Sequence, residues 1–591
     1  MPLERSVPLK KKEQKGMLAI FAVVLVALSL FLILYQRERI PVEEKAAGGD
    51  SAMKNWDERE SAVNGAPLVE DKSVYGEPDT SIYDVYLSVF PTKDPEGEML
   101  DFSAFGKHVS RDHTYNPVLN CNIQILKEDE KLDPLVNLDE KNATVRVRGN
   151  SSRGDTYKSY KIKLNEDADS FMGQRNLNIN KHSEDVTKIA TKLETDLLAE
   201  MDDMASYRTY FMRLWIRDTS LPAGEQKFKY YGLYTEIEQP NKTYLKARGL
   251  SSSGSMYKAR NFSFYYDDVL KDVDDPDYSE EAFETVLSIR EAKNHKKLLE
   301  MLAAVNDETN NFEEVFNRYF NEENYLTWLA FNLLMGNDDI INHNFILYNP
   351  GNSETWYFIP WDFDGTLHFG EYESSLMELP PSLKGGQKLN QSVLHRRYFR
   401  MEGSMKKIEK KMRELLKKNI TRSKVNGLLN DYKRVLDKTM TQYPDLSLLE
   451  MPPDRLPAYL DSLYDGILEN YQAFLTANKY PVPMYVAQPE KNKDGTVHFS
   501  WQPSYSYQGY PVTYKVKLYT DYNMSNLVLE EKDIVETFYD TPEPLKSGTY
   551  YLKVVAVDSK GHEQLSMERF ETMLTDVKAL NVNGLLEVKI E

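Results

Sequence analysis

Two neighbouring stretches, NDDIINHNFILY (337–348) and WYFIPWDFDG (356–365), carry acidic residues beside aromatic-rich segments. In the second stretch, Asp362 and Asp364 alternate with aromatic residues. Successive side chains of an extended chain point to opposite faces, so both carboxylates are expected on one face, where their oxygens can bind one hard cation. The pattern therefore predicts a Mg²⁺ site on Asp362 and Asp364.

The first stretch adds residues suited to phosphoryl transfer. Asp339 and Asn344 have the spacing by which protein kinases place a catalytic Asp and a metal-binding Asn on one loop, and Asp-Phe-Asp follows downstream as their metal-binding motif does. Phosphoryl transfer needs cations, positioned donors and a carboxylate that orients the attacking hydroxyl. The set therefore predicts Asp339 as the catalytic carboxylate and Asn344 as a metal ligand, with Asp338 open as the alternative base. Structural capping of turns is the competing interpretation, and the lone His343 is interpreted as a loop residue.

Positive charge is concentrated in a second region, VRVRGNSSRG (145–154) followed by YKSYKIKL (157–164). Two predicted strands flank a turn rich in Gly and Ser, whose backbone amides could meet phosphate oxygens. Neither G-x-x-x-x-G-K-[ST] nor G-x-G-x-x-G is present here. The region predicts half of a nucleotide site, or alternatively a hairpin with a solvated basic face. The candidate phosphate-neutralising residues are Arg148, Lys158 and Lys161.

The pattern of hydrophobic residues predicts an α+β fold. Alternating or β-rich runs predict strands at 82–90, 120–126, 143–148, 157–164, 207–216 and 228–237. Helical spacing predicts one helix at 185–201 and a helical half from position 279 onward, including 398–438 and 456–477. We therefore expect an N-terminal mixed sheet followed by a helical half.

The character of the chain changes again at Pro481-Val482-Pro483, beyond which short β runs predominate. Trp501, with Tyr550 and the inward alternation that follows it, suits a β-sandwich with a buried Trp and a tyrosine corner. These residues resemble a fibronectin type III domain, a class that usually binds or spaces.

Composition excludes several classes of protein. The 591 residues include 73 Lys and Arg against 92 Asp and Glu, a formal charge of -19 that disfavours general nucleic-acid binding. A single cysteine, Cys121, excludes intrachain disulfides and multi-cysteine zinc sites. With 41% hydrophobic residues, the chain can form a buried core.

An uncharged apolar run at 17–35 is long enough for one membrane-spanning helix. Basic residues predominate before it, so the positive-inside rule predicts a cytoplasmic N-terminus and an extracytoplasmic body. A cleaved signal peptide is the alternative, but Gln36-Arg37-Glu38-Arg39 follows in place of a small-residue cleavage site. We expect a basic tail at 1–16, the membrane helix at 17–35 and a polar tether at 36–80.

Several segments taken in order resemble the CotH kinases, a family named for a spore coat protein and related to atypical protein kinases. They are RGNSSR (148–153) with KSYKIKL (158–164), YGLY (231–234) leading to Glu238-Gln239, Tyr257-Lys258, and the two acidic stretches. The resemblance covers about 82–368, with a helical continuation to about 480. It implies a kinase-like domain at 81–480. The separate resemblance of the C-terminal residues gives a fibronectin type III-like domain at 481–575, and a tail is expected at 576–591.

The resemblance implies ATP-dependent transfer of phosphate to Ser or Thr of surface or spore coat proteins, with Mg²⁺ or Mn²⁺. By matching positions, Asp339 would be catalytic, and Asn344, Asp362 and Asp364 would serve the metal. Lys158 or Lys161 would neutralise the nucleotide, and Glu238 would be a hinge or ion-pair residue. Arg148 and Ser151 would shape the phosphate turn.

Two other functions remain open. An extracytoplasmic body would meet little ATP, so the chain could instead be a non-catalytic cell-surface binding or scaffold protein. A scaffold, however, has no need for an ordered set of four metal-binding or catalytic residues, and burying such charges without a cation is costly. A two-metal phosphoesterase is a weaker alternative, because the expected histidines are missing.

Overall fold

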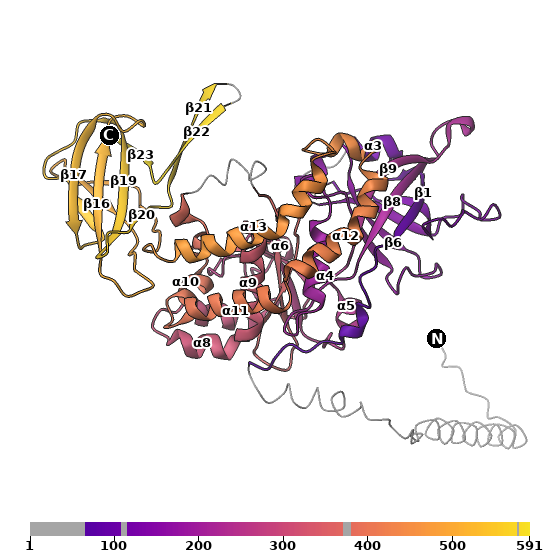
Figure 1. Ribbon diagram of the computed structural model, residues 1–591, viewed down its shortest axis with the longest axis horizontal. Helices are drawn as coiled ribbons and strands as arrows, with labels where there is room; N and C mark the ends of the chain where they lie inside the picture. The colour runs from indigo at the N-terminus through magenta and orange to yellow at the C-terminus, as the bar shows by residue number, and fades with distance from the viewer. Residues whose placement is uncertain (1–64, 108–114, 150, 370–379, 576–577) are drawn as a thin grey trace, which may run out of the picture. The chain divides into compact units, whose positions relative to one another are not determined.

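Seven strands close into a barrel in the N-terminal part of the computed structural model, which describes residues 65–107, 115–149, 151–369, 380–575 and 578–591. The order around the barrel is β1-β4-β5-β6-β7-β9-β8, and a parallel pairing of β1 with β8 completes it (Figure 1). The strands are β1 (Ile82–Phe90), β4 (Leu119–Lys127), β5 (Ala143–Arg148), β6 (Ser159–Leu164), β7 (Asn176–Asn180), β8 (Thr209–Asp218) and β9 (Lys229–Glu238). Short elements join them, namely β2 (Thr92–Lys93), β3 (Met99–Leu100), α3 (Phe102–Lys107), η2 (Ser151–Gly154) and η3 (Ala223–Glu225).

Alternation along β5 and β6 separates the barrel core from a charged outer face. Val145 and Val147 are buried in the barrel core, whereas Arg146 and Arg148 between and after them point the other way. Arg146 lies opposite Lys161 of β6 in the antiparallel register. The two strands therefore present their basic residues side by side on the outside of the barrel.

A second, four-stranded sheet is embedded in the helical half. Its order is β11-β10-β12-β13, and the strands are β10 (Ser255–Ala259), β11 (Leu287–Glu291), β12 (Phe345–Asn349) and β13 (Tyr357–Pro360). The helices are α4 (Ala190–Ala199), α5 (Lys242–Ala247), α6 (Glu280–Val286), α7 (Lys296–Asn306), α8 (Phe312–Tyr319), α9 (Glu322–Met335), α10 (Val393–Phe399), α11 (Ser404–Lys418), α12 (Arg422–Thr439) and α13 (Leu456–Ala477). Single turns of 3₁₀ helix occur at η1 (Lys72–Val74), η4 (Asp338–Ile341), η7 (Pro381–Leu383), η8 (Gln387–Gln391) and η9 (Asp445–Leu448).

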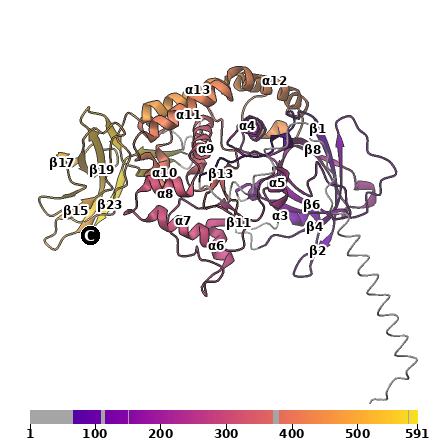
Figure 2. The same cartoon turned by 90° about the horizontal axis from the view of Figure 1, so that it is seen from below.

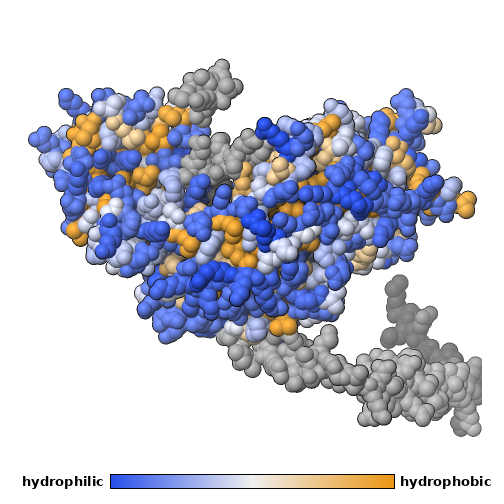
Figure 3. All heavy atoms as spheres, viewed as in Figure 1, coloured by the Kyte–Doolittle hydropathy of each residue, from blue (hydrophilic) through white to orange (hydrophobic). Residues whose placement is uncertain are grey.

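Helices α9 and α4 connect the parts of this body. Nearly every residue of α9 is buried, so the helix forms the centre of the largest hydrophobic core. Helix α4 contacts both barrel strand β8 and helix α12, which lie near it in Figures 1 and 2. The molecular face in Figure 3 is mostly hydrophilic, as expected when apolar residues fill these cores.

The six predicted strands are all confirmed, and so is the mixed α and β composition. The N-terminal sheet, however, closes into a barrel, and β7 and the strands of the second sheet were not predicted. The helix predicted at 185–201 begins only at Ala190, because the Asp185 carboxylate accepts hydrogen bonds from the backbone N–H groups of Thr187 and Ala190. Lys188, with a φ of 60°, also interrupts a right-handed helix there.

Two sheets sharing one hydrophobic core form a β-sandwich near the C-terminus. One contains β14 (Glu490–Lys491), β15 (Val497–Ser500) and β18 (Phe538–Asp540). The other contains β16 (Val512–Tyr519), β17 (Leu527–Ile534), β19 (Gly548–Asp558), β20 (Glu563–Leu565) and β23 (Leu586–Ile590), while β21 (Arg569–Thr575) and β22 (Lys578–Asn583) form a separate hairpin. Trp501 is buried, and the Tyr550 hydroxyl donates to the Lys546 carbonyl at 2.9 Å, as in a tyrosine corner.

The ends of the chain differ from expectation where they are described. The final part of the predicted tether packs on the body, since the Tyr75 hydroxyl donates to the Ser206 carbonyl at 3.1 Å. The predicted tail at 576–591 supplies β23, which pairs with β19 and buries Val588 and Ile590. The basic tail and the membrane helix predicted at 17–35 lie outside the described residues. Among the described helices, none is long and apolar enough to cross a membrane.

Candidate phosphotransfer site

The two acidic stretches meet because they occupy the same end of one strand pair. Strand β12 begins just after Asn344, and its antiparallel partner β13 ends just before Trp361. The Trp361 N–H donates to the Asn344 carbonyl at 3.2 Å. Asn344 and Asp362 adopt positive φ angles of 59° and 62°. Such strained backbone in non-glycine residues is concentrated at functional sites in proteins.

The loop before β12 presents Asp339 toward the second acidic stretch. Gly336 ends α9 in the left-handed region with a φ of 73°, and the Asn337 side chain caps η4 by accepting from the Asp339 N–H at 3.2 Å. The Asn344 amide donates to Oδ2 of Asp339 at 3.5 Å. A hydrogen bond from His343 lowers the pKa of Asp339, although burial opposes it. Asp339 is therefore an ionised, accessible carboxylate near both Asn344 and the Asp364–Gly365 turn.

Asp362 and Asp364 form a strongly interacting acidic pair. The negative charge of Asp362 raises the pKa of Asp364 well above its ordinary value, and burial, Asp185 and Asp339 raise it further. Two carboxylates this close favour a shared proton or a bound cation. The donor set, carboxylate oxygens with a nearby amide, is the one Mg²⁺ prefers. Within the described residues, however, no group of three or more His, Cys, Asp or Glu is arranged to hold a metal ion, so the acidic pair would need ligands from the nucleotide or water.

Opposite the acidic pair lies a set of basic residues that we call the basic cluster. Arg148 interacts electrostatically with both Asp362 and Asp364, and burial lowers its pKa to about 10. Burial, with the positive charge of other members of the cluster, lowers the pKa of Lys161 and of Lys258 to about 8, although Asp362 opposes the shift of Lys258. The cluster comprises Arg146 and Arg148 of β5, Lys161 of β6, Lys258 of β10 and Arg290 of β11.

The positive charge of the basic cluster is only partly compensated, by the more distant carboxylates of Asp362, Asp364 and Glu284. In the part of the chain that the structure describes, none of its members forms an ion pair, and Nε of Arg290 is buried without a hydrogen-bond partner. Lys161 donates only to the neutral Gln239 amide oxygen at 3.2 Å, and Nζ of Lys258 lies 5.1 Å from the centre of the Trp361 ring. Several half-buried cations that lack direct ion pairs are unfavourable beside one another, so the cluster suits a polyanionic ligand.

The turn after β5 is built around one glycine. Gly149 has a φ of 97°, and a Cβ there would lie 2.0 Å from Oγ of Ser152, so only glycine fits. Nζ of Lys158 donates to the Arg153 carbonyl at 2.7 Å and thereby braces the turn. Of the two candidate lysines, Lys161 lies near Arg146, Arg148 and Arg290 in the basic cluster. Lys158 instead stabilises the turn. Ser151 begins η2.

Glu238 serves as an ion-pair residue at the end of β9. Its two oxygens pair with Arg208 and Arg248, each at 2.6 Å, and its side chain is only 3% exposed. The resemblance implied a hinge or ion-pair residue at this position, grouped with the cofactor-binding residues. With both oxygens occupied, Glu238 is not available to bind a nucleotide directly.

Sequence reasoning missed three members of the basic cluster. Lys258 had been noted only as part of a motif, and Arg146 and Arg290 carried no role. The alternation of β5 gave a signal for Arg146, because it lies on the same face as Arg148. Arg290 could not be found this way, since its strand lies within a segment predicted to be helical.

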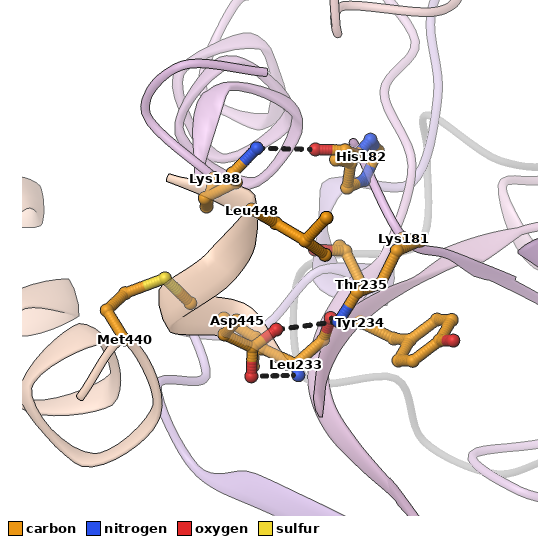
Figure 4. A pocket seen from close by; sticks show the side chains of 9 residues that line it. All are labelled: Lys181, His182, Lys188, Leu233, Tyr234, Thr235, Met440, Asp445 and Leu448. Atoms are coloured by element: carbon orange, nitrogen blue, oxygen red, sulfur yellow. Dashed lines mark hydrogen bonds and ion pairs between the residues drawn. The ribbon is translucent and has the colours of Figure 1, made fainter. Parts of the chain in front are cut away.

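A buried ion pair joins the barrel to the helical half behind this site. Nζ of Lys181, just after β7, lies 2.6 Å from Oδ1 of Asp445 in η9, and the two side chains are 2% and 4% exposed. Figure 4 shows the pair beside a cavity of about 10 Å³, room for about one water molecule. Oδ2 of Asp445 also accepts from the Leu233 N–H at 2.9 Å. The contact holds β9 and η9 together.

Comparison with known proteins gives three similarities. A family model described as CotH kinase protein matches residues 145–447, slightly more than half of the chain. Inner spore coat protein H of Bacillus subtilis (strain 168) is 24% identical over 246 residues, which are 40% of this chain and 63% of that protein, so the match spans less than two thirds of the relative. A solved Fn3-like protein from Clostridium thermocellum is 22% identical with a TM-score of 0.12, over 15% of this chain and 81% of that chain.

Proposed function

Because the chain belongs to the CotH kinase protein family, we propose that it transfers the γ-phosphate of ATP to Ser or Thr hydroxyls of cell-surface or spore coat proteins. The proposal includes Mg²⁺ or Mn²⁺ as the metal. The coat assignment draws on the similarity to a protein described as an inner spore coat protein. We further propose that residues 17–35 anchor the protein as a single membrane span, with the body outside the cytoplasm, and that the sandwich is a fibronectin type III-like binding module.

The observation that carries this proposal is the juxtaposition of the acidic pair and the basic cluster. The two are close enough for Asp362 to stabilise the positive charge of Arg148 and Lys258, yet no ion pair joins them among the described residues. A metal-bound triphosphate supplies the charges that both sides lack: a cation for the carboxylates and phosphate oxygens for the basic residues.

Each residue has a definite part in the proposed reaction. A divalent cation, when bound, would neutralise charge on the phosphates, and Asp362 and Asp364 would hold it with help from Asn344. Asp339 would orient the acceptor hydroxyl and take its proton as the oxygen bonds to the γ-phosphorus and the bond to ADP breaks. Members of the basic cluster would bind the phosphate oxygens, with Arg148 nearest to the acidic pair.

Replacement of Asp339 by asparagine tests the proposal and the choice of base. We expect Asp339→Asn to lower phosphate transfer by about 100-fold, because the amide cannot take the proton. The measurement is incorporation of radioactive phosphate from γ-labelled ATP into the full chain and into added Ser/Thr peptides, with Mg²⁺ or Mn²⁺. Asp338→Asn is the matched control and should keep most activity. The reverse result would make Asp338 the base, and no labelling by the unmodified protein would favour the binding-protein alternative.

The lysines of the basic cluster predict a pH-dependent affinity for ATP. Burial, together with the positive charges of Arg146, Arg290, Arg148 and Lys163, lowers the pKa of Lys161 to about 8. The residue is therefore charged at pH 7 and neutral at pH 9. If bound phosphate keeps it protonated, linkage predicts about tenfold weaker ATP binding across this range from Lys161, and a comparable loss from Lys258.

This dependence can be measured by calorimetry: ATP is titrated into the protein at pH values from 7 to 9, under conditions in which ATP is not hydrolysed. The terminal phosphate is already ionised over most of this range, since its second pKa is about 6, so a fall in affinity reports the protein. Lys161→Gln should bind more weakly at pH 7 and show only the part of the pH dependence that Lys258 supplies. An unchanged pH profile in Lys161→Gln would contradict the assignment.

A further inference from the structure

Residues 361–367, the loop after β13 that carries Asp362 and Asp364, are called the acidic loop. Helix α4 contacts this loop through one buried glutamate. The side chain of Glu194 is fully buried, and its Oε1 lies within hydrogen-bonding distance of the Thr366 hydroxyl. Thr366 directly follows the Asp364–Gly365 turn and is itself buried. The same hydroxyl also lies 2.7 Å from the carbonyl oxygen of Phe363, between the two acidic residues.

The number of hydrogens available to the two contacts of Thr366 indicates the protonation state of Glu194. A hydroxyl has one hydrogen, so Thr366 can donate either to the Phe363 carbonyl or to Glu194, but not to both. If Thr366 donates to the carbonyl, the contact with Glu194 needs a hydrogen from the glutamate. A neutral carboxylic acid supplies that hydrogen and satisfies both contacts, whereas a carboxylate leaves two acceptors competing for one hydrogen.

We propose that Glu194 is a positioning residue which, as a neutral carboxylic acid, donates to Thr366 and so holds the loop that carries Asp362 and Asp364. This inference rests on the proposed function in one respect, namely that the loop binds a metal. No substrate atom needs to touch Glu194, because its effect passes through Thr366 to the Phe363 carbonyl.

The surroundings of Glu194 support a neutral acid. Burial raises its pKa well above the ordinary value, and the nearby Asp185 raises it further. In the described part of the chain it has no basic partner within ion-pair distance, and its Oε2 has no hydrogen-bond partner. A buried carboxylate in this setting would be far costlier than a carboxylic acid.

Helix α4 is rigid enough to act as a support. Lys192 and Asp196 pair at 2.7 Å, and the Tyr432 hydroxyl of α12 donates to Asp196 at 2.5 Å. The hydroxyls of Thr195 and Thr209 lie 2.9 Å apart, which ties α4 to β8. Asp362, whose positive φ is unfavourable on its own, directly precedes Phe363, whose carbonyl oxygen is held through Thr366 from this helix.

Four variants of the full chain test this role. Glu194→Ala and Thr366→Val each remove the contact, whereas Glu194→Gln keeps a neutral hydrogen donor at the same place. Thr191→Val is the matched control, because it removes a buried hydroxyl from the same helix that has no hydrogen-bond partner among the described residues. The measurements are Mn²⁺ affinity by calorimetry, with Mn²⁺ alone as the probe, and hydrogen exchange of the amides at 361–367 without any ligand.

We expect Glu194→Ala and Thr366→Val to weaken Mn²⁺ binding by about tenfold, as loss of an outer partner of a metal ligand does, and to speed exchange at 361–367. Glu194→Gln and Thr191→Val should stay within about twofold of the unmodified protein. If Glu194→Gln loses as much as Glu194→Ala, the ionised carboxylate is what matters and the inference is wrong. It is also wrong if Thr366→Val leaves exchange unchanged.

Failure of the metal proposal would be visible separately. If the unmodified chain binds no Mn²⁺, the proposed function loses its metal. Hydrogen exchange still decides the role of Glu194: faster exchange at 361–367 in Glu194→Ala and Thr366→Val, but not in Glu194→Gln, supports positioning, and equal exchange in all variants overturns it.

Discussion

Replacing Asp362 by alanine is expected to lower phosphate transfer by at least about 1,000-fold, the largest catalytic effect of any single change in this protein. The residue belongs to the only pair of carboxylates we assign to the metal, and it also faces Arg148 and Lys258 of the basic cluster. Its removal takes away a metal ligand and the counter-charge that orders the phosphate-binding side chains. The measurement is single-turnover transfer from labelled ATP at saturating Mg²⁺.

A thermal-shift experiment separates lost chemistry from lost folding. Mg²⁺ should raise the melting temperature of the unmodified protein, because a ligand that binds only the folded state stabilises it, and it should not raise that of Asp362→Ala. Asp362→Asn, which keeps the shape but not the charge, should resemble the alanine variant. Activity of Asp362→Ala within tenfold of the unmodified protein would exclude this residue as the principal metal ligand.

Replacing Asp445 by alanine is expected to have the largest effect on stability, a loss of about 3–5 kcal/mol in the free energy of unfolding. The change leaves the buried ammonium of Lys181 without its charged partner and removes the acceptor of the Leu233 N–H (Figure 4). Urea denaturation followed by Trp fluorescence measures the loss.

The double variant Lys181→Met with Asp445→Leu is the control. It replaces both charges by apolar groups, and such replacements of buried ion pairs are often neutral or stabilising. We expect the double variant to recover most of the stability lost in Asp445→Ala. If the single variant is as stable as the unmodified protein, η9 does not hold the barrel against the helical half through this pair.

Sequence patterns predicted those features that depend on residues close together along the chain. The alternation in 143–148 predicted β5, and the spacing of Asp339, Asn344, Asp362 and Asp364 led to the expectation that these residues belong together. They meet because β12 and β13 are antiparallel neighbours in one hairpin, so residues just before one strand and just after the other must be close. The short separation along the chain made that prediction possible.

Long-range contacts could not be predicted in the same way. Lys258 and Arg290 join the basic cluster only because β10 and β11 are neighbours in a sheet that interrupts the helical half. Asp185 looked like the start of a helix, yet its carboxylate is used to cap one that begins five residues later. Glu194 and Thr366, separated by 172 residues, gave no sign of contact in the sequence.

By itself, the sequence determined which residues could perform the chemistry: carboxylates and an amide at the ends of a hairpin, a glycine where Ser152 leaves no room for a side chain, and a strand that places arginines on one face. These features depend only on the backbone conformation of a few consecutive residues. Only the tertiary structure decided that Lys161 rather than Lys158 belongs to the basic cluster, that Glu238 is consumed by two arginines, and that Glu194 supports the acidic loop. These outcomes depend on burial and on charges brought together from distant segments, which no local pattern encodes.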